Sequence, residues 1–338
     1  MTSEQPGADF PSHVPAPSDY TPAMASAPKG QYLDTVVPPG EELRELEAGD
    51  FVRPAGRRWI GPALLFVATC LSTFWAGATN WMPHLYLDNP QKAWAVLEHN
   101  WQDGLIYMVA VMGILLMHEM GHFVQTLRYH VPASLPIFLP LPVLMTGTMG
   151  AVIVMDASKA NRKQLFDIGL WGPWAGLIVA VPMIWFGIKT AAPDPVAGAL
   201  PFGTPLVFKL ITAWIRPELA TGAVVKNPLF MAGWVGMLVT GLNMLPVSQL
   251  DGGHVIYGLF GHRAKWIARA FVCAAIAMIV VSDQYNWVVM LVLVLMLGVD
   301  HPPTSDDSVR LGPVRWIIGL VSLLIPVFCF TPVIIPRS

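Results

Sequence analysis

Long apolar segments limit the folds that this chain can adopt. A helix that crosses the hydrocarbon core of a bilayer needs roughly 20 mostly apolar residues, because lipid offers the backbone no hydrogen-bond partner. Segments of this kind lie at about 59–79, 104–127, 166–188, 228–247, 264–282, 286–299 and 314–334. The segment 286–299 is short for a full span and is expected to be tilted or partly re-entrant. The sequence therefore predicts an all-α polytopic membrane protein with six to seven transmembrane helices.

The composition agrees with a membrane protein and argues against nucleic acid as a partner. Of the 338 residues, 54% are hydrophobic and 12% are charged, against roughly 25% charged residues in a soluble domain. The formal net charge is −2, and no cluster of Lys and Arg is interleaved with aromatic residues in a way that could follow a phosphate backbone. Cys70, Cys273 and Cys329 lie in apolar segments without CxxC spacing and are interpreted as small apolar side chains.

The charges of the loops predict the orientation. Positions 53–58 contain three arginines before the first span, whereas Lys92 is the only Lys or Arg in the loop 80–103 after it. Because cytoplasmic flanks are enriched in Lys and Arg, the N-terminus is expected in the cytoplasm. Residues 1–50 are polar and lack the basic and then apolar layout of a signal peptide, so they are expected to form an uncleaved, disordered tail. The remainder, 51–338, is expected to be one membrane-embedded domain.

Two stretches interrupt the helical pattern. Residues 130–156 have four prolines in their first thirteen positions and then a β-branched run, which excludes one continuous helix. We expect a re-entrant loop that ends in a strand and borders the functional site, because irregular backbone at membrane depth is tolerated only against protein or a watery cavity. The second stretch, 243–255, contains Pro246 and the pair Gly252–Gly253. A helix broken there would admit a carboxylate.

The sequence HEMGH lies at the end of the second apolar segment. His118 and His122 are four residues apart, so on a helix they share one face and can bind the same ion, with Glu119 beside them. Histidines on a helix can instead bind haem or form hydrogen-bonded pairs in a core. A charged side chain at this depth costs at least roughly 2.5 kcal/mol, which favours a functional role for Glu119. Zinc is the expected metal.

Asp251, in the sequence QLDGG, is the best candidate for a third metal ligand. Two imidazoles with one carboxylate are a common ligand set of hydrolytic zinc. His254, three residues later, could be the third ligand instead. Without the HEMGH sequence, Asp251 would be interpreted as a turn residue at a helix end. The other histidines are expected to be solvated: His13, His84, His99, His130, His262 and His301. Asp156 and Asp167 are expected to be structural caps.

Four sequence blocks, in this order, resemble one family: HEMGH, GTMGAVIVM, NRKQLFDIGLWGPWAG and AGWVGMLVTGLNMLPVSQLDGGH. Over about 104–262 the chain is similar to the site-2 proteases, which are intramembrane zinc metalloproteases, and most to their chloroplast and bacterial branch without PDZ domains. The resemblance implies one zinc ion, held by the two histidines of HEMGH and by Asp251. It also implies that Glu119 is the catalytic acid and base, and that Asn243 faces the substrate.

The same resemblance implies a reaction and a location. Proteins of this family cleave transmembrane segments of other membrane proteins, so transmembrane proteins are the expected substrates and a bacterial inner membrane is the expected location. The alternative is a zinc-binding transporter or an inactive homologue. The intact Glu119 argues against an inactive form, and the chain lacks the internal repeats that transporters often show. A membrane-bound metal oxidase would need more histidines, and the sequence does not indicate the oligomeric state.

The run TGTMGAVIVMD, 146–156, is the predicted substrate-binding element. It ends in β-branched residues and contains Gly147 and Gly150, which permit close approach of another backbone. We expect an edge strand to which an unwound substrate adds as a further β-strand, with Gly147, Thr148 and Gly150 in contact with it. An ordinary packed hairpin is the alternative.

Overall fold

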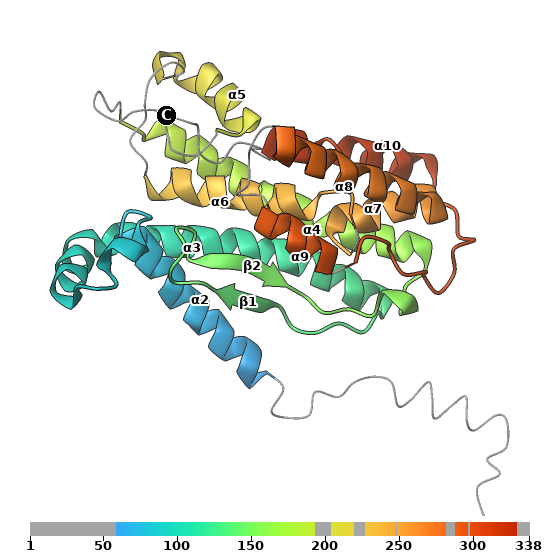
Figure 1. Cartoon of the computed structure of the whole chain (residues 1–338), viewed down its shortest axis with the longest axis horizontal. Coiled ribbons are helices and arrows are strands. Elements are labelled where there is room, and N and C mark those ends of the chain that lie inside the picture. Colours follow the sequence, from blue (N-terminus) through green and yellow to red (C-terminus); the bar gives the residue numbers. More distant parts are fainter. Residues whose placement is uncertain are drawn as a thin grey trace, which may run out of the picture. The chain divides into compact units, whose positions relative to one another are not determined.

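The computed structural model describes residues 59–192, 204–219, 227–247, 249–281, 288–296 and 298–329. Its α-helices are α2 (Ile60–Ala78), α3 (Pro90–Tyr129), α4 (Arg162–Lys189), α5 (Leu206–Ile215), α6 (Pro228–Asn243), α7 (Asp251–Phe260), α8 (Ala264–Val281), α9 (Val288–Met296), α10 (Pro313–Ser322) and α11 (Ile325–Cys329). The strands are β1 (Ile137–Pro140) and β2 (Thr148–Val152), and the short 3-10 helices are Pro83–Tyr86, Ala157–Lys159, Pro217–Leu219 and Gly261–Arg263 (Figure 1). The tail 1–50 lies outside the described residues, so its disorder and the domain boundary after it stay predictions.

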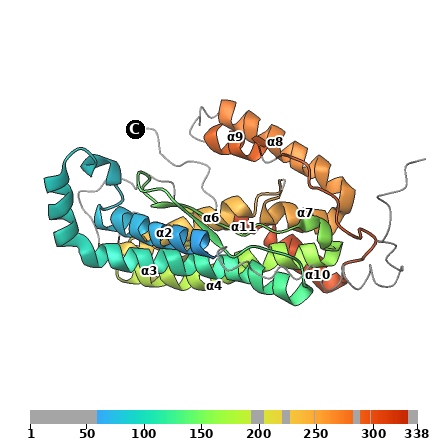
Figure 2. The same ribbon diagram turned by 90° about the horizontal axis from the view of Figure 1, so that it is seen from below.

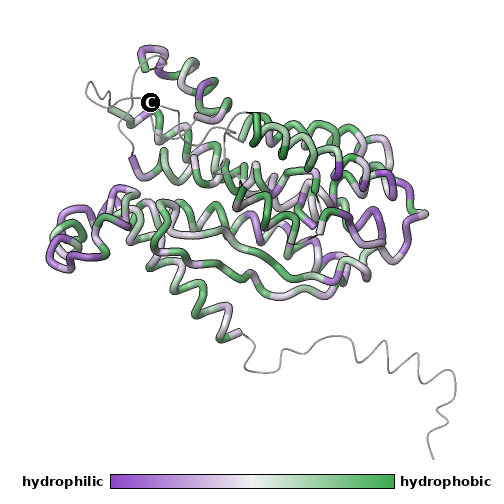
Figure 3. Tube along the Cα trace, viewed as in Figure 1, coloured by the Kyte–Doolittle hydropathy of each residue, from purple (hydrophilic) through white to green (hydrophobic). Residues whose placement is uncertain are grey.

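Four of the described helices are long and apolar enough to cross a membrane. They are Ile60–Ala78, Pro90–Tyr129, Arg162–Lys189 and Asp251–Val281, the last of which combines α7 and α8. Figure 3 shows mostly apolar residues along α2 and the central part of α3. The predicted count of six to seven spans is not confirmed, because α5, α6 and the pair α10–α11 are apolar but have only 10–17 residues. The predicted span 228–247 contains α6, of 16 residues, and the predicted span 286–299 contains α9, of 9 residues.

The helix that carries HEMGH begins earlier than predicted. The apolar pattern predicts a start near residue 104, but α3 begins at Pro90, after Asn89 caps its first turn. Inside the helix Asn100 has non-helical dihedral angles, and its side-chain amide donates a hydrogen bond to the carbonyl of Ala78 at 3.1 Å. The additional helical turns before residue 104 are thus stabilised by a cap and by a contact with the end of α2. Hydropathy indicates neither of these interactions.

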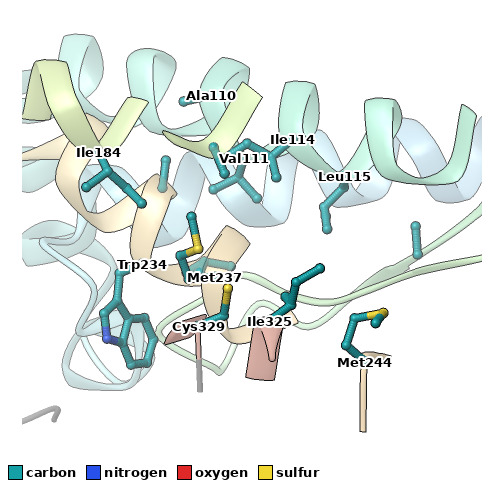
Figure 4. Packing of buried hydrophobic residues seen from close by; sticks show 14 of the residues in the cluster. Ala110, Val111, Ile114, Leu115, Ile184, Trp234, Met237, Met244, Ile325 and Cys329 are labelled. Atoms are coloured by element: carbon teal, nitrogen blue, oxygen red, sulfur yellow. The ribbon is translucent and has the colours of Figure 1, made fainter. Parts of the chain in front are cut away.

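The apolar core lies where α3, α4 and α6 pack together. A Cβ atom on Gly236 of α6 would lie 3.0 Å from Ile114 of α3 and 3.3 Å from Ala180 of α4. Figure 4 shows buried side chains of this core, among them Val111 of α3 and Met237 of α6. Because α6 approaches both neighbours so closely, the C-terminal end of α6 is held beside the HEMGH turn of α3.

Strands β1 and β2 form an antiparallel hairpin next to α2 and α3 (Figure 1). Ile137 pairs with Val152, and the register changes next to Pro140. The strand predicted within 146–156 is present as β2. β1 was not predicted, because Pro140 and the prolines on either side of the strand indicate a break. Pro140 is tolerated since it is the last residue of β1, where the register shifts and a backbone donor can be missing.

Two side chains anchor the turn of the hairpin to the helices. The hydroxyl of Tyr107 donates to the carbonyl of Thr146 at 3.0 Å, and the hydroxyl of Ser72 donates to the carbonyl of Gly147. Gly147 has a φ of 70°, and a Cβ atom there would lie 2.7 Å from the carbonyl oxygen of Ser72. A glycine is therefore required at 147 both by its backbone conformation and by the packing of the turn on α2.

The segment after α9 packs on α4. The backbone N–H of Ser305 donates to Ala160, and that of Arg162 donates to Asp306. Earlier in the chain, α8 lies beside α9 and contacts α7 (Figure 2). In the C-terminal third of the described chain, α8 and α10 thus contact the helix that begins at Asp251.

Asp167 is not the structural cap that the sequence predicted. Asn161 caps α4, whereas Asp167 is 6% exposed and accepts hydrogen bonds from the hydroxyl of Tyr129 and from the guanidinium of Arg315. It therefore joins α3, α4 and α10. Asp156 does cap the 3-10 helix that follows it, as predicted.

Candidate metal centre

The three predicted metal ligands, two on α3 and one on α7, lie close together. Nε2 of His118 lies 3.1 Å from Oδ2 of Asp251, and Nε2 of His122 lies 3.3 Å from Oδ1 of the same carboxylate. Ligand atoms from all three residues lie within 4.8 Å of one another, and no other group of this kind is found in the described part of the chain. Both histidines are at most 5% exposed. The fold thus joins residues that are 133 positions apart in the sequence.

Local backbone geometry explains how Asp251 reaches the histidines. The break predicted within 243–255 is present, since α6 ends at Asn243 and α7 begins at Asp251. The chain turns tightly here, and a Cβ atom on Gly252 would lie 2.2 Å from the carbonyl oxygen of Met244. Asp251 is therefore the first residue of a helix, where the helix dipole favours a negative charge.

The hydrogen bonding of His122 shows that the site suits a cation. Nδ1 of His122 lies 2.8 Å from the carbonyl oxygen of Ile168 and must donate to it, because a carbonyl can only accept. A neutral His122 then turns the lone pair of Nε2 toward Asp251, and these two electron-rich atoms repel unless a metal ion or a second proton on the imidazole lies between them. Two imidazole nitrogens with one carboxylate fit a catalytic zinc ion that keeps a fourth position open.

The predicted catalytic residues border the metal ligands. Glu119 is 3% exposed, and the backbone N–H of Ile153, directly after β2, interacts with its carboxylate. Nδ2 of Asn243, the last residue of α6, lies 3.3 Å from Nε2 of His118. Side chains or backbone groups from α3, α6, α7 and the hairpin therefore meet at one place.

Two glycines of α4 make room for the imidazoles, and sequence reasoning assigned them no role. A Cβ atom on Gly172 would lie 2.0 Å from Nε2 of His122, and one on Gly176 would lie 3.1 Å from Nδ1 of His118. The two glycines are four residues apart, like the two histidines. That matching interval on two neighbouring helices is the signal that could have identified α4 as the wall of the site.

The predicted substrate-binding residues lie in different surroundings within the hairpin. Gly147 packs on α2, as described above. The hydroxyl of Thr148 donates to the carbonyl of Leu139, inside the hairpin. Gly150 has a φ of 109°, and a Cβ atom there would meet only a side-chain atom of Val239, at 3.7 Å. Their contact with a substrate stays a prediction.

His254 and His301 form a pair one turn after Asp251. Nδ1 of His254 lies 2.7 Å from Nε2 of His301, which stacks on the ring of Tyr257. His254 is outside the group of three ligand atoms, so the geometry does not favour it as the third ligand. The prediction of a solvated His301 is wrong. The segment after α9 folds this residue onto α7, and burial holds the pKa of its imidazole below the ordinary value.

Comparison with known proteins identifies the family. Residues 106–282, more than half of the chain, match the model described as peptidase family M50. The chain belongs to this family, which confirms the resemblance to site-2 proteases.

Three relatives from plants show how far the similarity extends. The chain is 29% identical over 231 residues to "Probable zinc metalloprotease EGY1, chloroplastic" of Arabidopsis thaliana, covering 66% of this chain and 42% of that protein. It is 29% identical over 243 residues to the protein of the same name from Oryza sativa, covering 68% and 41%. It is 24% identical over 247 residues to "Probable zinc metalloprotease EGY2, chloroplastic" of Arabidopsis thaliana, covering 68% of this chain and 43% of that protein. The chain thus spans about two-fifths of the length of these relatives. No solved structure matches the chain.

Proposed function

We propose that this protein is an intramembrane zinc metalloprotease that hydrolyses peptide bonds in transmembrane segments of membrane-anchored proteins. The observation that carries this proposal is a group of three residues that could hold a metal ion, with Glu119 next to His118, on helices apolar enough to cross a membrane. Membership of peptidase family M50 supports it, as do relatives named as probable zinc metalloproteases. An inactive homologue or a transporter is less favoured, because the chain contains Glu119 beside the proposed ligand His118, with a carboxylate that can act as acid and base.

In this proposal His118, His122 and Asp251 hold one zinc ion. Bound zinc supplies Lewis-acid activation of a water molecule and of the substrate carbonyl. The carbonyl of Ile168 keeps the proton of His122 on Nδ1, so that Nε2 is free to coordinate. The role of the protein is therefore to present three donor atoms in fixed directions.

Glu119 moves the protons of the reaction. Its carboxylate takes a proton from the attacking water and later delivers it to the nitrogen of the broken peptide bond. Asn243 has a different role. Its amide donates a hydrogen bond to the oxygen on which negative charge develops, and its 3.3 Å approach to His118 places it next to the ligands.

We further propose that the substrate binds along β2. A peptide bond inside a helix is shielded, and unwinding it in lipid leaves backbone groups without partners, at a cost of several kcal/mol each. An added β-strand provides those partners. Gly147 and Thr148 then shape the hairpin, and Gly150 lies where close approach is possible.

The backbone of β2 indicates which edge the substrate would use. The carbonyl of Val154 accepts from the N–H of Ser134, and its N–H donates to the hydroxyl of Ser134, so Val154 faces the β1 side. Ile153 faces the other way, because its N–H interacts with Glu119. Alternation along a strand gives Ala151 the same direction as Ile153. The free edge of β2 therefore faces Glu119.

Proline substitutions test this edge. Ala151→Pro removes a backbone donor from the free edge and is expected to reduce cleavage by at least about tenfold, while zinc content stays unchanged. Val154→Pro is the matched control, since it removes a donor that faces the β1 side and should leave cleavage near the wild-type rate. Initial rates on a membrane-embedded peptide in detergent or liposomes are the measurement. Equal rates for the two variants would refute strand addition at this edge.

We also propose a bacterial inner membrane as the location, with the N-terminus in the cytoplasm. The support is the distribution of charge around the first span, with three arginines at 53–58 before it and Lys92 alone in the loop after it. The described structure is that of an integral membrane protein, through its four candidate spanning helices.

Metal removal tests the proposed function as a whole. The purified protein is expected to contain about one zinc ion per chain and to cleave a transmembrane peptide. Chelation should reduce the rate by at least about a hundredfold, and added zinc should restore it. Zinc content by elemental analysis and cleavage by mass spectrometry are the measurements. Protein that holds zinc and cleaves none of a panel of transmembrane peptides would indicate the inactive or transport class instead.

A further inference from the structure

The imidazole of His118 lacks the outer hydrogen bond that His122 has. A histidine that binds metal through Nε2 carries its proton on Nδ1 and almost always donates it to an oxygen atom, which fixes the orientation of the ring. For His122 that oxygen belongs to Ile168. Nδ1 of His118 is buried and has no partner. An acceptor for this N–H must therefore be sought among the neighbouring side chains.

Thr240 of α6 has a buried hydroxyl that is also without a partner. The side chain is 1% exposed, and its Oγ1 makes no hydrogen bond. Other buried threonines on the described helices behave differently, since Thr69, Thr73 and Thr126 each donate to a carbonyl of the preceding turn. A buried polar atom without a partner is costly and calls for an explanation.

The contacts of α6 with α3 place Thr240 level with His118. Gly236 faces Ile114, and further along both helices Asn243 reaches His118, so the two helices run in the same direction. Thr240 lies four residues after Gly236 and shares its helix face. His118 likewise lies four residues after Ile114. The two side chains without partners thus occupy the same level of the α3–α6 contact.

The contacts with α4 identify the edge of the imidazole that faces this level. Gly236 also faces Ala180 of α4, and one turn away on α4 lies Gly176. A Cβ atom on Gly176 would lie 3.1 Å from Nδ1 of His118. Nδ1 of His118 therefore lies against Gly176 of α4, at the level of the helix contacts that Thr240 occupies on α6.

We infer that, when the metal is bound, the Thr240 hydroxyl becomes the acceptor for the Nδ1 proton of His118, and that Thr240 is a positioning residue of the metal centre. This inference rests on the proposed zinc function. A threonine hydroxyl can accept from the imidazole and at the same time donate its own proton to a carbonyl of the preceding turn of α6. Thr240 then orients the first ligand as the Ile168 carbonyl orients the second.

Thr240→Val tests this inference, because valine keeps the shape of threonine and lacks the hydroxyl. Zinc affinity of the purified protein, measured by competition with a chromogenic chelator, is expected to fall about 10- to 100-fold. Melting of the metal-free protein should be unchanged or shifted upward, since the substitution removes a buried hydroxyl without a partner. A purely structural role predicts the opposite, a lower melting temperature and little change in zinc affinity.

Two further variants complete the experiment. Thr240→Ser retains the hydroxyl and should restore zinc affinity close to the wild-type value, whereas Thr69→Val, which removes a hydroxyl bonded within its own helix, should not change it. Unchanged affinity in Thr240→Val, or an equal loss in Thr69→Val, would overturn the inference. If the wild-type protein itself binds no zinc, the proposed function fails. If the wild type binds zinc and Thr240→Val binds it equally well, only the role of Thr240 fails.

Discussion

Replacing Glu119 with glutamine is expected to reduce cleavage of a membrane-embedded peptide by about a thousandfold and to leave zinc content near one ion per chain. Glutamine has the shape of glutamate but cannot accept a proton at neutral pH. The side chain lies outside the group of three ligand atoms, so its loss of charge should not remove the metal. It is 3% exposed, which leaves little room for bulk water to replace it as a base.

The controls for this prediction separate proton transfer from metal binding. Asp251→Ala should lose zinc as well as activity, because it removes a carboxylate that approaches both histidines. Glu98→Gln, which changes an exposed glutamate on the same helix, should change neither. Cleavage rates and zinc content are measured on the same preparations. A Glu119→Gln rate within tenfold of the wild type would show that another group moves the proton.

The sequence could predict the parts of the site that depend on residues close together in the chain. His118 and His122 are neighbours on any helix because they are four residues apart, and an apolar run predicted the helix. Asp251 is far away in sequence, and it was selected by a proline and a glycine pair that break a helix around it, together with the family resemblance. Helices α2 and α4 were predicted within a few residues, because their apolar lengths match the bilayer.

The parts that sequence could not predict depend on packing between distant segments. The carbonyl that orients His122 is 46 residues away, and His301 reaches His254 across 47 residues. No periodicity in either segment indicates such a contact. β1 was missed for a similar reason, since the prolines in and around it indicate a break when taken alone, and only pairing with β2 makes the segment a strand.

Gly172→Ala is expected to lower zinc affinity by more than about a hundredfold, beyond the usual effect of losing an outer hydrogen bond to a metal ligand. The new Cβ atom would lie 2.0 Å from Nε2 of His122, the atom proposed to bind the metal. The imidazole cannot simply move aside while its Nδ1 stays bonded to Ile168. Either the ring leaves that carbonyl or α4 shifts away from α3, and both displace a ligand.

Helix propensity acts in the opposite direction, which makes this prediction specific. Alanine in place of glycine inside a helix gains about 1 kcal/mol when nothing else changes, so α4 itself should form at least as well. Gly113→Ala on α3 is the matched control, because a Cβ atom there meets nothing within 4 Å and zinc binding should persist. The zinc affinity of Gly176→Ala should lie between those of Gly172→Ala and Gly113→Ala, since its Cβ would lie 3.1 Å from the imidazole of His118. Chelator competition measures all three affinities, and circular dichroism checks that helix content is kept. Wild-type zinc affinity in Gly172→Ala would mean that His122 is not held against α4 when metal binds, and the proposed ligand geometry would have to be abandoned.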